Sequence, residues 1–261
     1  MKLIIIIFRF FLSRRYKVEI KGSEILKSKS AKFILPNHQA VVDPQLVFAY
    51  VSKFCTVVPV ITEGYFKNPL LRIILKTIKA VPVSDLAAGN RDINVLNTIF
   101  TNVTNALKNG RNVLLYPSGQ IAGQGYEKIF NKQSAWAIVF NLHDNTQVIG
   151  VRISGLWGSI WSKAWMGKSP DFFKTFLKSV FYIFANLLFF VPKRKVVIEF
   201  FDITAEAKIK SEESRSAFNL FLEKFYNING VEEAKYLKHF FYVPSLKRNL
   251  PDIIDGAHKG E

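Results

Sequence analysis

The chain reads Phe33-Ile34-Leu35-Pro36-Asn37-His38-Gln39-Ala40-Val41-Val42-Asp43-Pro44 where a short apolar run passes through a polar turn into a proline. The apolar run predicts a buried strand, and Pro44 predicts the first turn of a helix. A neutral imidazole such as that of His38 can take a proton from a hydroxyl. A carboxylate within reach, here Asp43, fixes the tautomer and stabilises the imidazolium. No serine or cysteine nucleophile stands in this stretch, which leaves a hydroxyl of the substrate as the candidate nucleophile.

The same two residues also have a purely structural interpretation. His38 is then a turn histidine, and Asp43-Pro44 is only the start of a helix. A histidine and an aspartate separated by four residues do not decide between the two interpretations, because a motif match of this size arises by chance. The rest of the chain has to decide.

Strand-like segments alternate with helix-like segments along the chain. We expect strands over residues 17–20, 32–35, 55–60, 80–83, 112–116, 147–153 and 195–201. Helices are expected over residues 44–53, 68–79, 93–107, 134–142 and 212–227. This alternation predicts an α/β fold, in one domain, with a mostly parallel or mixed central sheet flanked by helices. We expect the domain to cover residues 17–230, followed by a peripheral helix and tail over residues 231–261.

The composition indicates a partner that is both oily and anionic. The net charge is +16, from 36 basic and 20 acidic residues, and 49% of the chain is hydrophobic, with 24 phenylalanines. A phospholipid surface has both properties, whereas nucleic acid would explain only the charge, and no nucleic-acid motif is present. The single cysteine, Cys55, excludes an internal disulfide and a cysteine-cluster metal site, and is compatible with a reducing cytoplasm.

Three segments are candidates for contact with a membrane. Residues 1–16 are apolar but too short to span a bilayer, so we expect a membrane-associating helix, with an ordinary buried helix as the alternative. Residues 172–191 predict an amphipathic helix lying in the plane of the membrane. Trp157, Trp161 and Trp165 recur at intervals of four. If their segment is helical, the rings share a face, and we place membrane contact ahead of core packing for them.

Four segments in this order resemble the glycerolipid acyltransferase family, which includes the 1-acylglycerol-3-phosphate acyltransferases. That family has an asparagine-histidine-x4-aspartate motif, a Phe-x-x-Pro segment, a Phe-Pro-Glu-Gly block and a Val-Pro-Val strand. The resemblance covers roughly residues 17–202, and several ordered motifs are far more specific than one. The segments here are Asn37-His38 through Asp43, then Tyr65-Phe66-Lys67-Asn68-Pro69 with Val81-Pro82-Val83, then Tyr116-Pro117-Ser118-Gly119, then Val148-Ile149-Gly150-Val151.

The resemblance implies transfer of an acyl group from acyl-CoA or an acyl-acyl-carrier-protein to a lipid hydroxyl, with no cofactor and no metal. His38 would be the general base and Asp43 would orient it. The enzyme would sit on the cytoplasmic face of the inner (cell) membrane, against its anionic surface. Glu63 would bind the acceptor, with a structural ion pair as the alternative. The other residues implied in substrate binding are Asn37, Tyr116, Pro117, Ser118, Gly119 and Gln120, and amides near Gly119 are candidate oxyanion donors.

The departures from the family pattern concern the acceptor. Ser118 replaces the family's glutamate, Gln120 stands where an arginine follows, and Asp85 stands at the place of a second arginine. A phosphate monoester favours guanidinium partners, so lysophosphatidic acid is not the expected acceptor. Arg72, Arg91, Lys128 and Arg152 are the candidate substitutes. Ser118 lacks a Gly-x-Ser-x-Gly setting, so we expect it to position the acceptor or close a turn.

Two further stretches are similar to the acyltransferase halves of fused acyltransferase/acyl-carrier-protein synthetase proteins, which reacylate lysophospholipids that keep a headgroup. No ligase module is present, so the acyl group has to arrive activated, and the basic surface suits an acidic carrier protein. Loss of the glutamate and arginines favours a non-catalytic membrane-binding protein as the alternative, and a docking partner in a lipid-modifying cluster is a second one. Retention of His38 and Asp43 favours the enzyme. The two stretches are Gly125-Tyr126-Glu127-Lys128 and Arg152 to Ser159.

Overall fold

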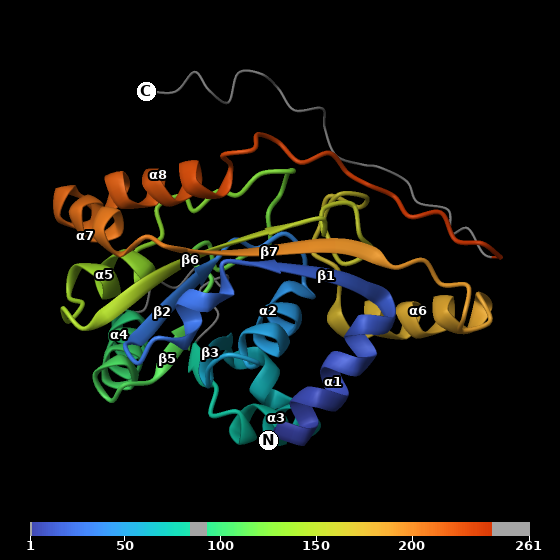
Figure 1. The fold of residues 1–261 in the computed structure, drawn as a ribbon, viewed down its shortest axis with the longest axis horizontal. Coiled ribbons are helices and arrows are strands. Elements are labelled where there is room, and N and C mark those ends of the chain that lie inside the picture. The colour runs from blue at the N-terminus through green and yellow to red at the C-terminus, as the bar shows by residue number, and fades with distance from the viewer. Residues whose placement is uncertain (1, 84–92, 242–261) are drawn as a thin grey trace.

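The computed structural model describes residues 2–83 and 93–241. A seven-stranded sheet runs through the molecule in the order β1-β7-β6-β2-β5-β3-β4 (Figure 1). All neighbouring strands are parallel except β6 and β7, so the expected mixed sheet is confirmed. The strands are β1 Tyr16–Lys21, β2 Ala31–Pro36, β3 Val57–Thr62, β4 Val81–Val83, β5 Asn112–Leu114, β6 Thr146–Ser154 and β7 Arg194–Asp202.

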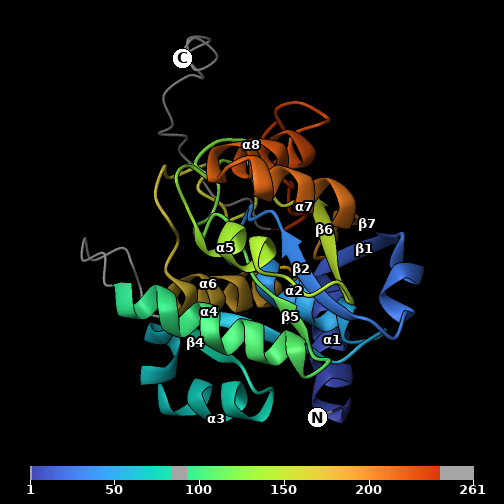
Figure 2. The same cartoon turned by 90° about the vertical axis from the view of Figure 1, so that its left-hand side faces the viewer.

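Helices cover both faces of this sheet (Figures 1 and 2). The α-helices are α1 Lys2–Arg15, α2 Asp43–Val51, α3 Pro69–Thr77, α4 Ile93–Lys108, α5 Ser134–Phe140, α6 Phe172–Ala185, α7 Thr204–Glu213 and α8 Arg215–Tyr226. Two short 3-10 helices, η1 Ser23–Lys27 and η2 Glu63–Lys67, follow β1 and β3.

The central strand β2 shows why the two faces need cover. All six of its residues are buried, and successive side chains point to opposite faces. Ile34 belongs to a core built with α2, with Leu12 of α1 and Phe172 of α6 at its margin. Phe33 and Leu35 belong to a second core built with α4, α5, α7 and α8. A strand buried on both faces reads as the continuous apolar run that the sequence shows.

The C-terminal region differs from our expectation of one helix over residues 212–227. Two helices form instead, and Ser214 separates them with an extended backbone (φ −176°, ψ 165°). The Ser214 hydroxyl caps α8 by accepting a hydrogen bond from the Ala217 amide (3.0 Å). The missed helix, α7, buries only Ala207 and Ser211, so its sequence lacks the apolar periodicity that marks a helix.

The tryptophan segment was also predicted wrongly. Residues 157–165 form a series of turns and no helix, because Gly155 and Gly158 adopt positive φ values of 95° and 83°. Trp157 and Trp161 are buried, and Trp161 packs in the α2-side core rather than facing a membrane. Trp165 donates its indole N–H to the Gly158 carbonyl oxygen (2.7 Å), which ties the turns together.

The expected terminal segments have separate outcomes. Helix α1 is present where a helix was expected, and α6 covers most of the second apolar stretch. None of the helices within residues 2–83 and 93–241 is long and apolar enough to cross a bilayer. Residues 231–241 form no helix, contrary to expectation; they run as a strap whose Glu232 amide donates to the Gly125 carbonyl oxygen (2.7 Å). The rest of the predicted peripheral helix and tail, residues 242–261, lies outside the described residues.

Candidate active site

Three chain segments meet at one edge of the sheet. Strands β2, β5 and β3 are parallel neighbours, so the segments that follow their carboxyl ends emerge side by side. His38 follows β2, the block of residues 116–120 follows β5, and Glu63 directly follows β3. The crevice beyond the carboxyl ends of parallel strands is where open α/β sheets bind their ligands.

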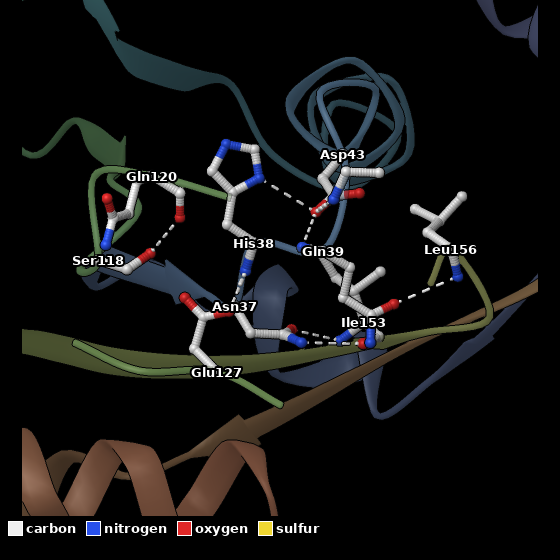
Figure 3. A network of polar contacts seen from close by, with 10 residues as sticks. Asn37, His38, Gln39, Asp43, Ser118, Gln120, Glu127, Ile153 and Leu156 are labelled. Carbon is white, nitrogen blue, oxygen red and sulfur yellow. Dashed lines mark hydrogen bonds and ion pairs between the residues drawn. The ribbon is translucent and has the colours of Figure 1, made fainter. Parts of the chain in front are cut away.

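His38 and Asp43 form a close pair at this edge. The distance between His38 Nδ1 and Asp43 Oδ2 is 3.2 Å, and the Asp43 side chain is fully buried at the start of α2. The same oxygen accepts the amides of Gln39 and Ala40, the latter at 3.0 Å. Burial raises the pKa of Asp43, against the hydrogen bonds that favour its charged form. The second ring nitrogen of His38 faces away from Asp43 (Figure 3), and 14% of the side chain is exposed.

The backbone of His38 is also held, so the imidazole has little freedom to move. Its amide donates to Oε2 of Glu127 (2.9 Å), and its carbonyl oxygen accepts from the Ala122 amide (2.7 Å). Together with the contact to Asp43, these bonds fix His38 at three points, of which Figure 3 shows the contacts to Asp43 and Glu127. Groups that act in catalysis need this kind of preorganised support.

Glu127 is a residue beside His38 to which we assigned no role from the sequence. It is buried, its amide donates to the side-chain oxygen of Asn227, and the Asn227 amide group donates back to its carbonyl oxygen, both at 2.8 Å. Burial raises the pKa of Glu127 to about 8, against the hydrogen bond from the His38 amide, and the charge of Asp43 adds to the rise. Its carboxyl lies beside Ser118, so a carboxyl group is present next to the block that lacks the family's glutamate (Figure 3).

The Asn37 side chain, which we expected to bind substrate, makes hydrogen bonds within the protein. Its side chain is turned into the protein, where Oδ1 accepts the Ile153 amide (2.7 Å) and Nδ2 donates to the Ile153 carbonyl oxygen (3.0 Å). Gln39 is used in the same way, since Oε1 accepts the Leu156 amide (3.2 Å) and Nε2 donates to Glu232 (2.6 Å). These two amide side chains anchor the turn on either side of His38, and a role of Asn37 in substrate binding stays a prediction.

The block after β5 forms a tight turn beside His38. The Tyr116 ring lies 4.5 Å from the His38 ring, centroid to centroid, while Pro117 and Ser118 are buried. The Ser118 hydroxyl donates to the Gln120 carbonyl oxygen (2.9 Å), which is the turn-closing role we expected. Gly119 has a φ of 62°, and its amide donates to the Tyr116 carbonyl oxygen (3.1 Å), so the turn itself uses the amide that we considered as an oxyanion donor. Gly119 and Gln120 are exposed at the edge of the sheet.

The remaining candidate residues from the sequence have no hydrogen bond, ion pair or ring contact with His38 among those of the described residues given above. Glu63 is exposed as the first residue of η2, and its role stays a prediction. Arg152 stacks on the Phe201 ring, with 4.1 Å from the guanidinium carbon to the ring centroid, and this contact lies on the α8 side of the sheet. Lys128 lies over aromatic rings, Arg72 is exposed on α3, and Arg91 and Asp85 lie outside the described residues. Within the described part of the chain, no group of three or more acidic, histidine or cysteine side chains is placed to hold a metal ion.

The comparisons with known proteins agree with this geometry. A family model described as "Acyltransferase" matches residues 17–154, more than half of the chain, and includes His38, Asp43 and the block after β5. The chain belongs to the acyltransferase family. The crystal structure of the 1-acyl-sn-glycerophosphate (LPA) acyltransferase PlsC from Thermotoga maritima resembles this acyltransferase with a TM-score of 0.50 and 17% sequence identity. The match covers 82% of this chain and 70% of that chain. No curated protein matches the chain.

Proposed function

We propose that this acyltransferase moves a fatty acyl group from an acyl thioester to a hydroxyl of a lysophospholipid or a related lipid. The donor would be acyl-CoA or an acyl-acyl-carrier-protein. The observation that carries the proposal is the His38–Asp43 pair, 3.2 Å apart, with the carboxylate buried and the free ring nitrogen turned away from it (Figure 3). A turn histidine with no chemical role would not need this support from three sides.

The geometry suggests a direct transfer without an acyl-enzyme. Nδ1 carries the proton that faces Asp43, which leaves a lone pair on Nε2. Nε2 takes the proton of the acceptor hydroxyl while the hydroxyl oxygen forms the new ester bond to the thioester carbonyl carbon. The carbon–sulfur bond then breaks, and the imidazolium returns the proton to the leaving thiolate. Asp43 stabilises the imidazolium in between, and such proton transfer typically contributes about 10²–10⁴-fold.

The acceptor that we propose keeps its headgroup. Gln120 is exposed next to the block that packs against His38, at a position where the family pattern has an arginine. An amide does not match the two parallel donors of a guanidinium on a phosphate monoester. A lysophospholipid such as lysophosphatidylethanolamine therefore suits the site better than lysophosphatidic acid.

We also propose that the protein works on the cytoplasmic face of the cell membrane, with α1, α3 and α6 toward the lipid. The N-terminal end of α1 and helix α3 lie at the same end of the molecule in both views (Figures 1 and 2). Basic side chains accompany these helices, which suits an anionic surface. The exposed apolar side chains there are Ile6, Ile7, Phe8, Phe10 and Phe11 on α1, Ile73 and Ile74 on α3, and Phe173, Phe176, Leu177, Phe181 and Phe184 on α6.

The proposal is tested by incubating the purified protein with an acyl thioester and a panel of lysolipids, and measuring thiol release and diacyl product. We expect product with headgroup-bearing lysolipids and less with lysophosphatidic acid. A strong preference for lysophosphatidic acid would show that other basic residues replace the missing arginines. Absence of product with every donor and acceptor, while vesicle binding persists, would support the non-catalytic membrane-binding alternative.

A further inference from the structure

A pocket whose lining includes neither His38 nor Asp43 lies elsewhere in the molecule. It is formed where α1, β1, α6, β7 and the strap of residues 231–241 come together, and its cavity volume is about 40 Å³. Tyr16 lines this pocket and lies close enough to Asp43 to sense its charge. Burial raises the pKa of Tyr16 to about 12, and the charge of Asp43 adds to the rise. The titratable side chains that line the pocket are Arg15, Tyr16, Tyr182, Arg194, Tyr236 and His239.

Two arginines give this pocket a positive charge that no carboxylate in residues 2–83 and 93–241 neutralises by an ion pair. Arg194 is buried, and its two terminal nitrogens donate to four backbone carbonyl oxygens, those of Gly155 (3.0 Å), Trp157 (3.5 Å), Gly158 (3.1 Å) and Lys235 (2.7 Å). Arg15 donates to the Pro192 carbonyl oxygen (3.3 Å). Burial lowers the pKa of both arginines, which reports the cost of keeping these charges away from water. The carboxylate of the nearby Glu232 accepts hydrogen bonds from the Gln39 side-chain amide and from the Gly155 backbone amide instead.

The histidine in the lining adds an independent observation. His239 is only 6% exposed, and neither of its ring nitrogens makes a hydrogen bond of good geometry to a described residue; its polar contact with the backbone of Leu237 is a weak one. Burial lowers its pKa, and the positive charge of Arg15 lowers it further. A buried polar group without a partner is unfavourable, and an acceptor placed in the pocket would satisfy it. An anion would accept from the histidine and from Arg15, and it would compensate the charge of Arg194, whose terminal nitrogens already donate to backbone carbonyl oxygens.

We propose that this pocket binds a phosphate group, held by Arg15, Arg194 and His239. Guanidinium groups match the oxygens of a phosphate in charge and geometry, whereas a neutral ligand would not compensate the positive charge. The phosphate comes either from free inorganic phosphate or from the headgroup of a phospholipid. The inference does not rest on acyl transfer, because the pocket is separate from the open side of His38.

The surroundings of the pocket favour a lipid headgroup. Arg15 ends α1 and Tyr182 lies on α6, the two helices that expose most of the apolar side chains described above. Beyond α6 the chain exposes Leu187, Leu188 and Phe189, and the strap that carries His239 ends in the exposed Phe240 and Phe241. A phospholipid whose phosphate enters the pocket would have its acyl chains among apolar side chains rather than in water.

The first experiment titrates inorganic phosphate into the full chain at constant ionic strength, with Arg15→Gln and Arg14→Gln as a matched pair. Both variants remove one positive charge from the last turn of α1, but Arg14 is exposed and lies over the Phe10 ring outside the pocket. We expect saturable binding by the wild type, weakened at least about tenfold by Arg15→Gln and little changed by Arg14→Gln, because charge-assisted hydrogen bonds are lost only in the first. Equal binding by the two variants would overturn the proposal.

The second arm distinguishes the sources of the phosphate. Flotation with phosphatidylcholine vesicles containing phosphatidylglycerol measures lipid binding by the same variants, with and without free phosphate as a competitor. A loss specific to Arg15→Gln, together with competition, supports a headgroup site. Phosphate binding that depends on Arg15 without any such effect on vesicles supports a site for free phosphate.

A spectroscopic measurement keeps the test independent of variant folding. The imidazole C–H resonance of His239, assigned with His239→Gln, reports its pKa in the wild-type protein by NMR. Phosphate beside it should raise this pKa, because an anion stabilises the imidazolium. An unchanged His239 titration in saturating phosphate would overturn the proposal even if Arg15→Gln failed to fold.

Discussion

Glu127 provides a sharp test of the electrostatics at the site. Burial raises the pKa of its carboxyl from 4.5 to about 8, so the folded protein keeps a proton that the unfolded chain loses as the pH rises. The unfolded state then binds fewer protons than the folded state, and stability falls with increasing pH by about 1.4 kcal/mol per pH unit. Below about pH 4.5 both states are protonated and above about pH 8 both are charged, so the slope is confined to the interval between them.

The variant Glu127→Gln removes this titration while keeping an oxygen that accepts the His38 amide. Between about pH 5.5 and 7.5 the wild type should lose about 2–3 kcal/mol more stability than the variant. The assay is urea unfolding followed by circular dichroism at intermediate pH values. The reasoning is refuted if both proteins lose the same stability over this interval, because Glu127 would then titrate like a solvated carboxyl.

Three further perturbations follow from the contacts at the site and on the helices. Asp43→Asn should lower kcat by about 10²-fold or more in steady-state assays and leave lysolipid KM nearly unchanged, since the pair acts on the proton; an unchanged kcat would remove Asp43 from the mechanism. Gly125→Ala places a Cβ 2.0 Å from the Glu232 carbonyl oxygen and should destabilise the protein by about 1–3 kcal/mol in urea unfolding. Gly123→Ala is the control, because a Cβ there meets nothing within 4 Å and should not lower stability. Equal effects of the two variants would mean that the strap is not packed as described. Leu177→Glu on α6, where the side chain is 67% exposed, should weaken vesicle binding in flotation. Ile209→Glu on α7, where the side chain is 56% exposed, should leave vesicle binding unchanged. Weaker binding by Ile209→Glu than by Leu177→Glu would place the membrane on the other face.

The sequence predicted the parts of the fold that are periodic. The apolar run at residues 33–36 predicted the central strand β2, and the alternation of strands and helices predicted the mixed α/β sheet that the structure confirms. Helix α7 was missed because it presents almost no apolar face. The turns around Trp157 and Trp161 were misjudged because two glycines with positive φ end the regular spacing, which one-dimensional periodicity does not register.

The contact between His38 and Asp43 was predictable because both residues lie on one short turn. Its support was not, because Glu127 and Glu232 reach the turn from segments that are 89 and 193 residues from their partners, His38 and Gln39. Asn37 was assigned to substrate because an amide beside a catalytic histidine suggests that role, whereas its bonds to Ile153 depend on the neighbouring strand β6. Long-range pairings of this kind become visible only when the sheet is assembled.

The measurement that tests the central claim most directly is single-turnover acyl transfer by His38→Ala beside His143→Ala. Both variants remove one imidazole, but His143 is exposed in the turn between α5 and β6, at the amino end of β6, whereas His38 follows the carboxyl end of the parallel strand β2. We expect His38→Ala to lose about 10²–10⁴-fold in rate, with its unfolding curve and vesicle binding unchanged, whereas His143→Ala should keep wild-type turnover. Undiminished acyl transfer by His38→Ala would contradict the assignment of His38 as the base.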